Sequence, residues 1–417
     1  MTGLYTTLNL TMSIPVVATA ALAAWRLRGS DRRRWLVGVG GALAILLVLT
    51  AVFDNLMIAA GLVAYDTALT SGFRLGLAPI EDFSYAVAAA VFVPSAWALL
   101  TAGGRGTGED DDEGHDPDPP AAAGRAAPPG LLATLFWASR PVSWINTAAP
   151  FALAYLLASG GFDVRGVIGS LFFLVPYNLA MYGINDVFDY ESDLRNPRKG
   201  GVEGSVLDRS RHRATLVASA GTTLPFLAYL VAVGTLESSL WLAASAFAVI
   251  AYSARGLRFK EIPFLDSVTS AFHFVSPAIV GWTLVGAPLT GAVWACLAAF
   301  LLWGAASQAF GAVQDVRFDR EAGLSSVATV LGARATVRFA LACYAAAVVV
   351  LVVAAPWPAS GAAAAVLPYL ATVAAYARVG DGDAERTNEG WKRFLVLNGL
   401  AGFCVTQIVL WSVIVWS

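Results

Sequence analysis

The sequence is poor in charge, and this shortage narrows the class of protein. Only 13% of its 417 residues are Asp, Glu, Lys or Arg, whereas an average soluble domain carries about 25%. The formal net charge is −2, so no basic field attracts polyanions, which excludes a nucleic-acid partner. Cysteine and histidine are also scarce, with three of each. The three cysteines lie in apolar runs without a CxxC or Cys/His pattern, which predicts buried thiols rather than disulfides or a structural metal.

Long apolar runs, by contrast, are abundant. Hydrophobic residues make up 57% of the chain, and the mean hydropathy is +0.65. A helix needs roughly 20 mostly apolar residues to cross a bilayer, so the sequence predicts an all-α, multi-pass protein of the cell membrane with about 12 transmembrane helices. We place these helices near residues 4–25, 35–53, 79–101, 142–160, 166–184, 214–233, 239–252, 267–285, 291–312, 337–355, 362–377 and 394–416.

The distribution of positive charge supports this count and gives the orientation. When the loops alternate between two sides, one side holds 25 of the 27 Lys and Arg residues, and only Arg74 and Arg165 fall on the other. Short cytoplasmic loops of membrane proteins are enriched in Lys and Arg. We therefore place the basic side in the cytoplasm and both termini outside.

A polar segment interrupts the apolar runs at 102–130. It contains the acidic run 109–113, followed by prolines among alanines and glycines. Such a composition cannot bury enough apolar surface to offset its ordering entropy, which predicts a disordered cytoplasmic linker. The linker divides the chain into a three-helix membrane domain, residues 1–101, and a nine-helix membrane domain, residues 131–417.

The first candidate site in the nine-helix domain is an acidic cluster at the cytoplasmic end of a predicted helix. Asp186, Asp189 and Asp193 are spaced three and four residues apart, so on a helix they share one face. Three like charges on one face repel each other unless a cation lies among them. Carboxylates at this spacing suit Mg²⁺, which takes oxygen ligands and keeps substrate phosphates in its coordination shell.

A second acidic cluster follows a later helix at the same predicted side. Asp315 and Asp319 are again one helical turn apart, and Arg258 and Lys260 lie between the two clusters in the sequence. These cations can donate hydrogen bonds to a diphosphate. The alternative is that such acids only face water or pair with arginines. Two clusters on one side of a chain this poor in charge favour function instead.

Together these segments resemble the signature of the UbiA superfamily of intramembrane prenyltransferases. The resemblance rests on NDxxDxxxD at 185–193, YSxxxxRxK at 252–260 and DxxxDxxxG at 315–323, and it covers about 131–417. It implies a bundle of nine helices that binds a prenyl diphosphate through two Mg²⁺ ions. The chain departs from the pattern at Gly323, which stands where a third acid is expected.

The resemblance also implies a role for each matched residue. The implied metal ligands are Asp186, Asp189, Asp193, Asp315 and Asp319. The implied diphosphate-binding residues are Asn185, Lys199, Arg258 and Lys260. Tyr252 matches the family tyrosine near the carbon that ionises.

The chemistry implied by this site needs no nucleophilic triad, and the sequence contains none. Metal and cationic side chains stabilise charge on the leaving diphosphate, and a dry apolar chamber protects the allylic cation from water. His273 lies on a predicted helix and is interpreted as a packed or backbone-bonded histidine, with a base toward the acceptor as the alternative.

The three-helix domain has few polar residues, and most are acidic. Asp54 follows the second predicted helix, and Pro79, Glu81 and Asp82 open the third. Taken alone, these acids are typical of helix rims and of capping near a helix N-terminus. Their arrangement also resembles the lycopene cyclase domain of the small membrane type, over about 1–101, in which a PxE(D/E) motif opens the last helix.

This second resemblance implies acid-initiated ring closure of a polyene. Glu81 or Asp82, with Asp54 nearby, would be the acid, because protonating a polyene needs a carboxyl group whose pKa is raised in an apolar site. Such cyclases have two three-helix units and this chain has one, so the resemblance implies a second cyclase subunit as partner.

The two resemblances together suggest a lycopene elongase fused to a cyclase subunit of C50 carotenoid biosynthesis. The expected substrates are dimethylallyl diphosphate and lycopene, and the expected cofactor is Mg²⁺. Two alternatives remain open. One is a prenyltransferase of an aromatic or quinone precursor with a non-catalytic front domain, and the other is a transporter with acidic ion sites.

Overall fold

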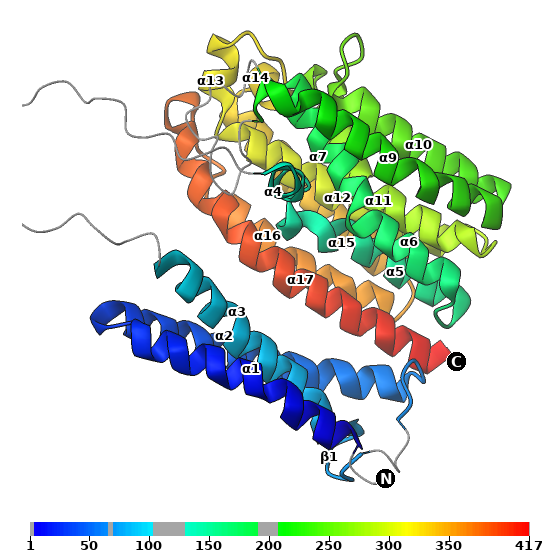
Figure 1. The fold of residues 1–417 in the computed structure, drawn as a ribbon. Helices are drawn as coiled ribbons and strands as arrows, with labels where there is room; N and C mark the ends of the chain where they lie inside the picture. The colour runs from blue at the N-terminus through cyan, green and yellow to red at the C-terminus, as the bar shows by residue number, and fades with distance from the viewer. Residues whose placement is uncertain (1–3, 66–69, 103–129, 191–206, 417) are drawn as a thin grey trace, which may run out of the picture. The chain divides into compact units, whose positions relative to one another are not determined.

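The chain folds into two helical units, which are described separately here (Figure 1). The computed structural model describes residues 4–65, 70–102, 130–190 and 207–416. The first compact unit spans Met1–Ala126 and the second Ala127–Ser417. The predicted linker lies outside the described residues except at its two ends, and the domain boundaries stay a prediction.

The first unit consists of three long helices and a small hairpin. The helices are α1 (Leu4–Arg26), α2 (Gly29–Ala59) and α3 (Phe83–Ala102), and both α1 and α2 pack against α3. The hairpin strands β1 (Arg74–Leu75) and β2 (Ala78–Pro79) precede the 3-10 turn η1 (Ile80–Asp82). The Asn55 side chain fastens the hairpin to α2, because its Oδ1 accepts from the Leu77 amide at 2.5 Å.

The start of the third helix differs from the prediction. Pro79 was expected in its first turn, but Pro79 belongs to β2, and α3 begins only at Phe83. Glu81 and Asp82 therefore lie in the turn η1, before the helix rather than within it.

The second unit is a bundle whose helices follow the predicted order. Two spans are interrupted: α4 and α5 are separated by the 3-10 turn η2, and α6 gives way to α7 at Pro176. The elements are α4 (Leu131–Ala138), η2 (Pro141–Ser143), α5 (Trp144–Ser159), α6 (Val164–Leu174), α7 (Pro176–Phe188), α9 (Arg209–Val233), α10 (Leu236–Ser253), η3 (Phe259–Glu261), α11 (Leu265–Leu284), α12 (Gly291–Val313), α13 (Val316–Glu321), α14 (Val327–Leu331), α15 (Ala333–Ala354), η4 (Ala359–Ala362), α16 (Ala363–Ala374), η5 (Asp381–Arg386) and α17 (Thr387–Trp416).

Helix α11 lies at the centre of this bundle. It packs against α5, α10 and α12, and the outer helices continue from α12 through α15 and α16 to α17, which returns to α5. Small residues permit the close approaches: a Cβ on Gly281 would collide with the Phe151 backbone, and one on Gly304 would lie 2.8 Å from the Ala271 Cβ. Such small-residue contacts are the usual means by which membrane helices pack closely.

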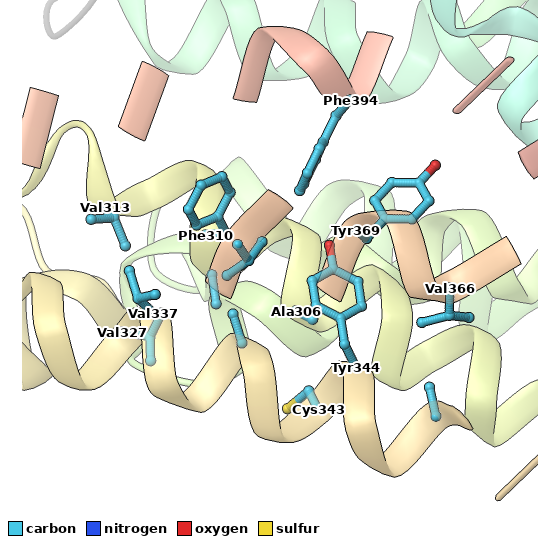
Figure 2. Close-up of a cluster of buried hydrophobic side chains, with 14 of the residues drawn as sticks. Ala306, Phe310, Val313, Val327, Val337, Cys343, Tyr344, Val366, Tyr369 and Phe394 are labelled. Carbon is cyan, nitrogen blue, oxygen red and sulfur yellow. The ribbon is translucent and has the colours of Figure 1, made fainter. Parts of the chain in front are cut away.

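The largest buried apolar cluster joins α12, α15, α16 and α17 (Figure 2). Its aromatic residues include Phe310, Tyr344, Tyr369 and Phe394. The two tyrosine hydroxyls are paired, Tyr344 with Ser307 at 2.7 Å and Tyr369 with Asn398 at 2.8 Å, as a polar group in an apolar interior requires.

The cysteines only partly match the prediction. Cys343 is buried in this cluster, whereas Cys404 on α17 is exposed, and both are unpaired thiols. The expectation of burial fails at Cys404 because an apolar run that faces lipid has the same composition as one that faces the protein core.

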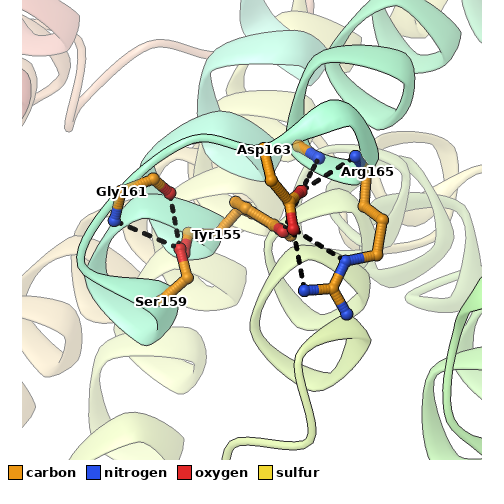
Figure 3. A network of polar contacts seen from close by, with 6 residues as sticks. Tyr155, Ser159, Gly161, Asp163 and Arg165 are labelled. Carbon is orange, nitrogen blue, oxygen red and sulfur yellow. Dashed lines mark hydrogen bonds and ion pairs between the residues drawn. The ribbon is translucent and has the colours of Figure 1, made fainter.

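Helices α6 and α7 together form one apolar segment long enough to cross the membrane. At the start of this segment, opposite to the end that carries Asp186, Asp163 is the N-cap of α6 (Figure 3). The Asp163 carboxylate accepts from the Arg165 and Gly166 amides at 2.8 and 3.1 Å and from the Tyr155 hydroxyl at 2.5 Å. The Arg165 guanidinium lies 2.8 Å from the same carboxylate and holds the pKa of Asp163 well below its ordinary value.

These features confirm the predicted class. Among the described residues, eight helical segments are long and apolar enough to cross a membrane. The protein is an all-α, multi-pass membrane protein, and the predicted number of 12 spans is approximate.

Candidate functional site

The first acidic motif lies where α7 ends. Asp186 is in the last turn of the helix, while Asp189 is the C-cap, with φ −96° and ψ 0°. Both aspartates are buried, with 3% and 8% of their surface exposed. The α-helix ends at Phe188, but the Asp189 amide still donates to the Asn185 carbonyl at 2.9 Å, so Asp186 and Asp189 lie close together at the end of α7, and the shared face of all three aspartates stays a prediction. Asp193 and Lys199 lie outside the described residues.

Each of these two aspartates is paired with a cation from a different segment. Arg140 Nη2 lies 2.9 Å from Asp186 Oδ1, and its guanidinium is 4.3 Å above the Tyr182 ring. Lys260 forms an ion pair with Asp189, and Arg258 Nη2 lies 3.9 Å from the same carboxylate. The predicted basic residues therefore do meet the first motif.

Both arginines have a backbone conformation that is uncommon outside glycine. Arg140 has φ +50° and Arg258 has φ +41°. Non-glycine residues in this left-handed region cluster at functional sites, where the surrounding structure holds them. Arg140 immediately precedes Pro141 and the η2 turn, so the interruption between α4 and α5 is what brings its guanidinium to Asp186.

Arg140 was missed from the sequence. It was counted only as a loop charge near the first helix of the nine-helix domain. The signal that could have revealed it is a single arginine before a proline, where a helix must break.

The Lys260 ammonium is largely buried. Its side chain is 14% exposed, and burial lowers its pKa to about 8, against the opposing charges of Glu261 and Asp186. The neighbouring Arg258 is also paired with Glu261. The loop between α10 and α11 thus presents two cations, one of them strongly desolvated, to the end of α7.

Asn185 and Tyr252 connect the first motif to α10. Asn185 Oδ1 accepts from Ser253 Oγ at 2.7 Å, next to Tyr252 at the end of that helix. The Tyr252 ring packs against the His273 ring of α11, and Ser270 on the same helix donates to Gln308 Oε1 on α12 at 3.1 Å.

The second acidic motif follows α12. Asp315 is the N-cap of α13, and the Asp319 amide donates to the Asp315 carbonyl at 2.8 Å, so the two lie one helical turn apart as predicted by their spacing. Gly323 has φ +72°, which lets the chain reverse directly after α13. This need for left-handed backbone gives a structural reason for glycine where a third acid was expected.

Contacts between loops put both acidic segments at one end of the second unit. Lys260 reaches Asp189 from the loop that precedes α11. At the start of α11, Asp266 Oδ2 accepts from the Val327 amide at 3.0 Å, just after the second motif. Within the described part of the chain, no group of three or more His, Cys, Asp or Glu residues is arranged to hold a metal ion.

The first unit has an acid cluster of a different kind. Glu81 and Asp82 are buried, and Glu81 Oε1 accepts from the Ser71 amide at 2.5 Å. Asp82 is hydrogen-bonded to the Tyr65 hydroxyl, and it lies close enough to Asp54 for their charges to interact. Burial raises the pKa of Asp82, and the Glu81 charge raises it further. Tyr65 was not found from the sequence, because it is a loop residue outside any motif.

The fold and these buried acid–cation pairs define a helical membrane protein with a charged cluster at one end of its larger unit. Residues 147–399 match the UbiA prenyltransferase family model, which covers more than half of the chain. The chain belongs to the UbiA prenyltransferase family. Residues 3–99 match the lycopene cyclase family model, so both resemblances drawn from the motifs are confirmed.

Curated relatives cover either the whole chain or its second unit. The C(50) beta-cyclic carotenoids biosynthesis protein LbtBC of Dietzia sp. (strain CQ4) is 78% identical and aligns over 100% of both chains. A lycopene elongase/hydratase of Corynebacterium glutamicum is 54% identical, over 65% of this chain and 94% of that protein. One of Halobacterium salinarum is 36% identical, over 48% of this chain and 71% of that protein.

Solved structures are more distant in sequence. A UbiA homolog from Archaeoglobus fulgidus bound to DMAPP and Mg²⁺ aligns with a TM-score of 0.48 at 18% identity, over 66% of this chain and 99% of that chain. An apo UbiA homolog from Aeropyrum pernix K1 aligns with a TM-score of 0.46 at 20% identity, over 69% of this chain and 98% of that chain.

Proposed function

We propose that the second unit transfers dimethylallyl groups from dimethylallyl diphosphate to the ends of lycopene, with Mg²⁺ as cofactor. The observation that carries this proposal is the pairing of buried Asp186 and Asp189 with Arg140 and Lys260 at one end of the bundle. Membership of the prenyltransferase family and the names of the relatives support the same chemistry. The positive-inside rule places this end in the cytoplasm, where the diphosphate is available.

The donor atoms available suit a magnesium diphosphate. Carboxylate oxygens are the ligands that Mg²⁺ prefers, and Asp186, Asp189, Asp315 and Asp319 supply them, with Asp193 as a further ligand from the motif. The Arg140 Nε is buried and has no hydrogen-bond partner among the described residues, so it is a donor suited to an anionic ligand. When bound, Mg²⁺ would neutralise charge on the diphosphate and favour cleavage of the allylic C–O bond.

The cationic side chains would bind the leaving group. Arg140, Arg258 and Lys260, with Asn185 and Lys199 from the first motif, would hold the diphosphate oxygens as negative charge grows on them. The pairing of Arg140, Arg258 and Lys260 with aspartates would hold these cations in place for the substrate.

The apolar bundle below this end would protect the reactive cation. The Tyr252 ring, at the end of α10, lies 5.3 Å from the buried His273 ring between centroids, and we infer that it lies near the ionising carbon and stabilises positive charge with its π face. The π electrons of a terminal lycopene double bond would then attack the allylic carbon. Water is excluded by the packed helices, which favours attack by the polyene.

For the first unit we propose a cyclase subunit that protonates the elongated polyene. The observation that favours it is the buried carboxyl of Asp82, held by Tyr65 and close to Asp54, with Glu81 adjacent. A carboxyl group with a raised pKa can donate a proton to a double bond and start ring closure. Because residues 1–101 provide only one three-helix unit, the active cyclase would also contain a partner subunit.

Expression in a host that accumulates lycopene tests the elongase activity. We expect elongated carotenoids from the intact chain and unchanged C40 lycopene from Asp189→Asn. Unchanged lycopene with the wild-type chain, together with prenylation of an aromatic or quinone precursor, would replace the proposal by that alternative. Ion-dependent transport without prenyl transfer would favour a transporter.

A further inference from the structure

One buried polar atom in the second unit has no structural role that the described residues explain. His273, on α11, is 3% exposed, and its Nε2 has no hydrogen-bond partner among them. The buried polar side chains about one helical turn further along α11 and α10, by contrast, are hydrogen-bonded to each other. Ser245 Oγ bonds to the Tyr177 hydroxyl at 3.0 Å and to Ser276 Oγ at 2.7 Å. Leaving a buried polar group unpaired is costly, so the unpaired His273 Nε2, like the Arg140 Nε at the end of the bundle, calls for an explanation.

The other ring nitrogen fixes which form of the imidazole is present. The Ala248 backbone on α10 lies near the His273 ring, and since Nε2 has no partner, the Ala248 carbonyl is the acceptor available to Nδ1. A carbonyl accepts, so Nδ1 carries the hydrogen. In the neutral ring, Nε2 then carries the lone pair, which makes it a base rather than a donor.

The position of His273 places this lone pair below the diphosphate end of the bundle. Its ring lies edge-on to the Tyr252 ring, with centroids 5.3 Å apart. Ser253, the residue after Tyr252, donates to Asn185 Oδ1 of the first motif at 2.7 Å. In addition, helical side chains lean toward the N-terminus of their own helix, so Tyr252 leans into the bundle and His273 leans toward the diphosphate end.

The proposed reaction requires a base at this level. Once the polyene has attacked the allylic carbon, a tertiary carbocation remains on the former lycopene end, and a proton must leave. We propose that His273 Nε2 is the catalytic base that accepts this proton. The inference rests on the proposed elongase function and adds the residue that completes it.

The electrons and atoms balance in this step. The allylic C–O pair leaves with the diphosphate, and the π pair of the terminal lycopene double bond forms the new C–C bond. A C–H bond adjacent to the resulting cation then breaks. Its electron pair becomes a new C=C bond, and its proton moves to Nε2, from which it is later released to solvent.

The test compares two products of a turnover in membranes supplied with lycopene and dimethylallyl diphosphate. His273→Asn keeps an amide donor for the Ala248 carbonyl but removes the base, and His273→Gln is the second variant. We expect wild-type KM for the diphosphate and continued release of inorganic diphosphate. The elongated carotenoid that carries the new C=C bond should fall about 100-fold, the typical contribution of a general base, because only its formation needs the proton to be removed. The tertiary carbocation should instead react with water, so elongated alcohols should appear in place of the alkene.

His212→Asn is the matched histidine control, because His212 Nε2 already bonds to the Leu207 carbonyl at 3.0 Å. Wild-type elongation is expected for it. Wild-type amounts of the elongated alkene from His273→Asn would overturn the proposal. So would an equal loss of diphosphate release and product, or failure of both variants to fold, since either would assign His273 to packing. Failure of the elongase function itself would differ, because the wild-type chain would then make no elongated product.

Discussion

The two units both gather carboxylates near helix ends but surround them differently. In the second unit, Asp186 and Asp189 are each paired with a cation. In the first unit, Asp82 has a tyrosine hydroxyl as its partner, and no ion pair joins Asp54 or Asp82 to a cation among the described residues. A paired carboxylate stays ionised and suits a metal diphosphate, while an unpaired buried carboxyl favours the protonated form that an acid catalyst needs.

Removing a paired carboxylate of the second unit should have the largest effect. For Asp189→Asn and Asp315→Asn we expect prenyl transfer to fall about 1,000-fold or more, because charge on the leaving diphosphate would lose much of its stabilisation. The measurement is elongated carotenoid formed per chain in membranes. Asp163→Asn is the matched control, since Asp163 is also ion-paired but at the other end of the bundle. An equal loss in the control would contradict a local role.

Removing the acid of the first unit should separate the two activities. We expect Asp82→Asn to lower cyclic product about 100-fold while elongation continues, because only ring closure needs a proton donor. Chromatography of carotenoids from cells that also express a cyclase partner measures both. If elongation fell in parallel with cyclisation, the division of labour between the units would be wrong.

Replacing a cationic side chain of the second unit should reduce prenyl transfer less than replacing one of its carboxylates. Arg140→Gln is expected to raise KM for dimethylallyl diphosphate about 10- to 100-fold, since hydrogen bonds to charged groups contribute about 1.5–3 kcal/mol. Arg140→Lys should recover only part of the loss, because lysine lacks the planar fork of donors. An unchanged KM in both variants would remove Arg140 from the diphosphate site.

The smallest expected effect is on stability at the far end of the bundle. Asp163→Ala removes the cap of α6 and should lower stability by about 1 kcal/mol with no change in KM. Because pairing with Arg165 lowers the pKa of Asp163, its contribution is present above the unfolded pKa of about 3.9 and is lost as pH falls through the lower folded pKa. Thermal unfolding at pH 7 and below pH 4 measures this, and an identical loss at both pH values would refute the electrostatic part.

The helices, the fold class and the spacing within the second acidic motif could be predicted, because they depend on the local pattern of residues in the sequence. The apolar runs gave the helices and the fold class, and the spacing of Asp315 and Asp319 matched one turn of α13. The α-helix ends at Phe188, a little beyond the predicted end near 184, because a run of acids at helical spacing gives no sign of where the backbone leaves the helix.

The partners of the acids could not be predicted, because they come from distant segments. Arg140 and Tyr65 belong to no motif, and only the folded chain brings them to Asp186 and Asp82. The unpaired His273 Nε2 is a property of three-dimensional packing, so the sequence left both of its interpretations open.

The most direct test of the central claim is the binding of Mn²⁺, as a paramagnetic substitute for Mg²⁺, in the presence of inorganic diphosphate. We predict diphosphate-dependent Mn²⁺ binding to the wild-type chain that is weakened by Asp189→Asn and, separately, by Asp315→Asn, because both motifs would contribute ligands to one site. Binding that is lost in Asp189→Asn but unchanged in Asp315→Asn would contradict a shared site formed by the two acidic segments.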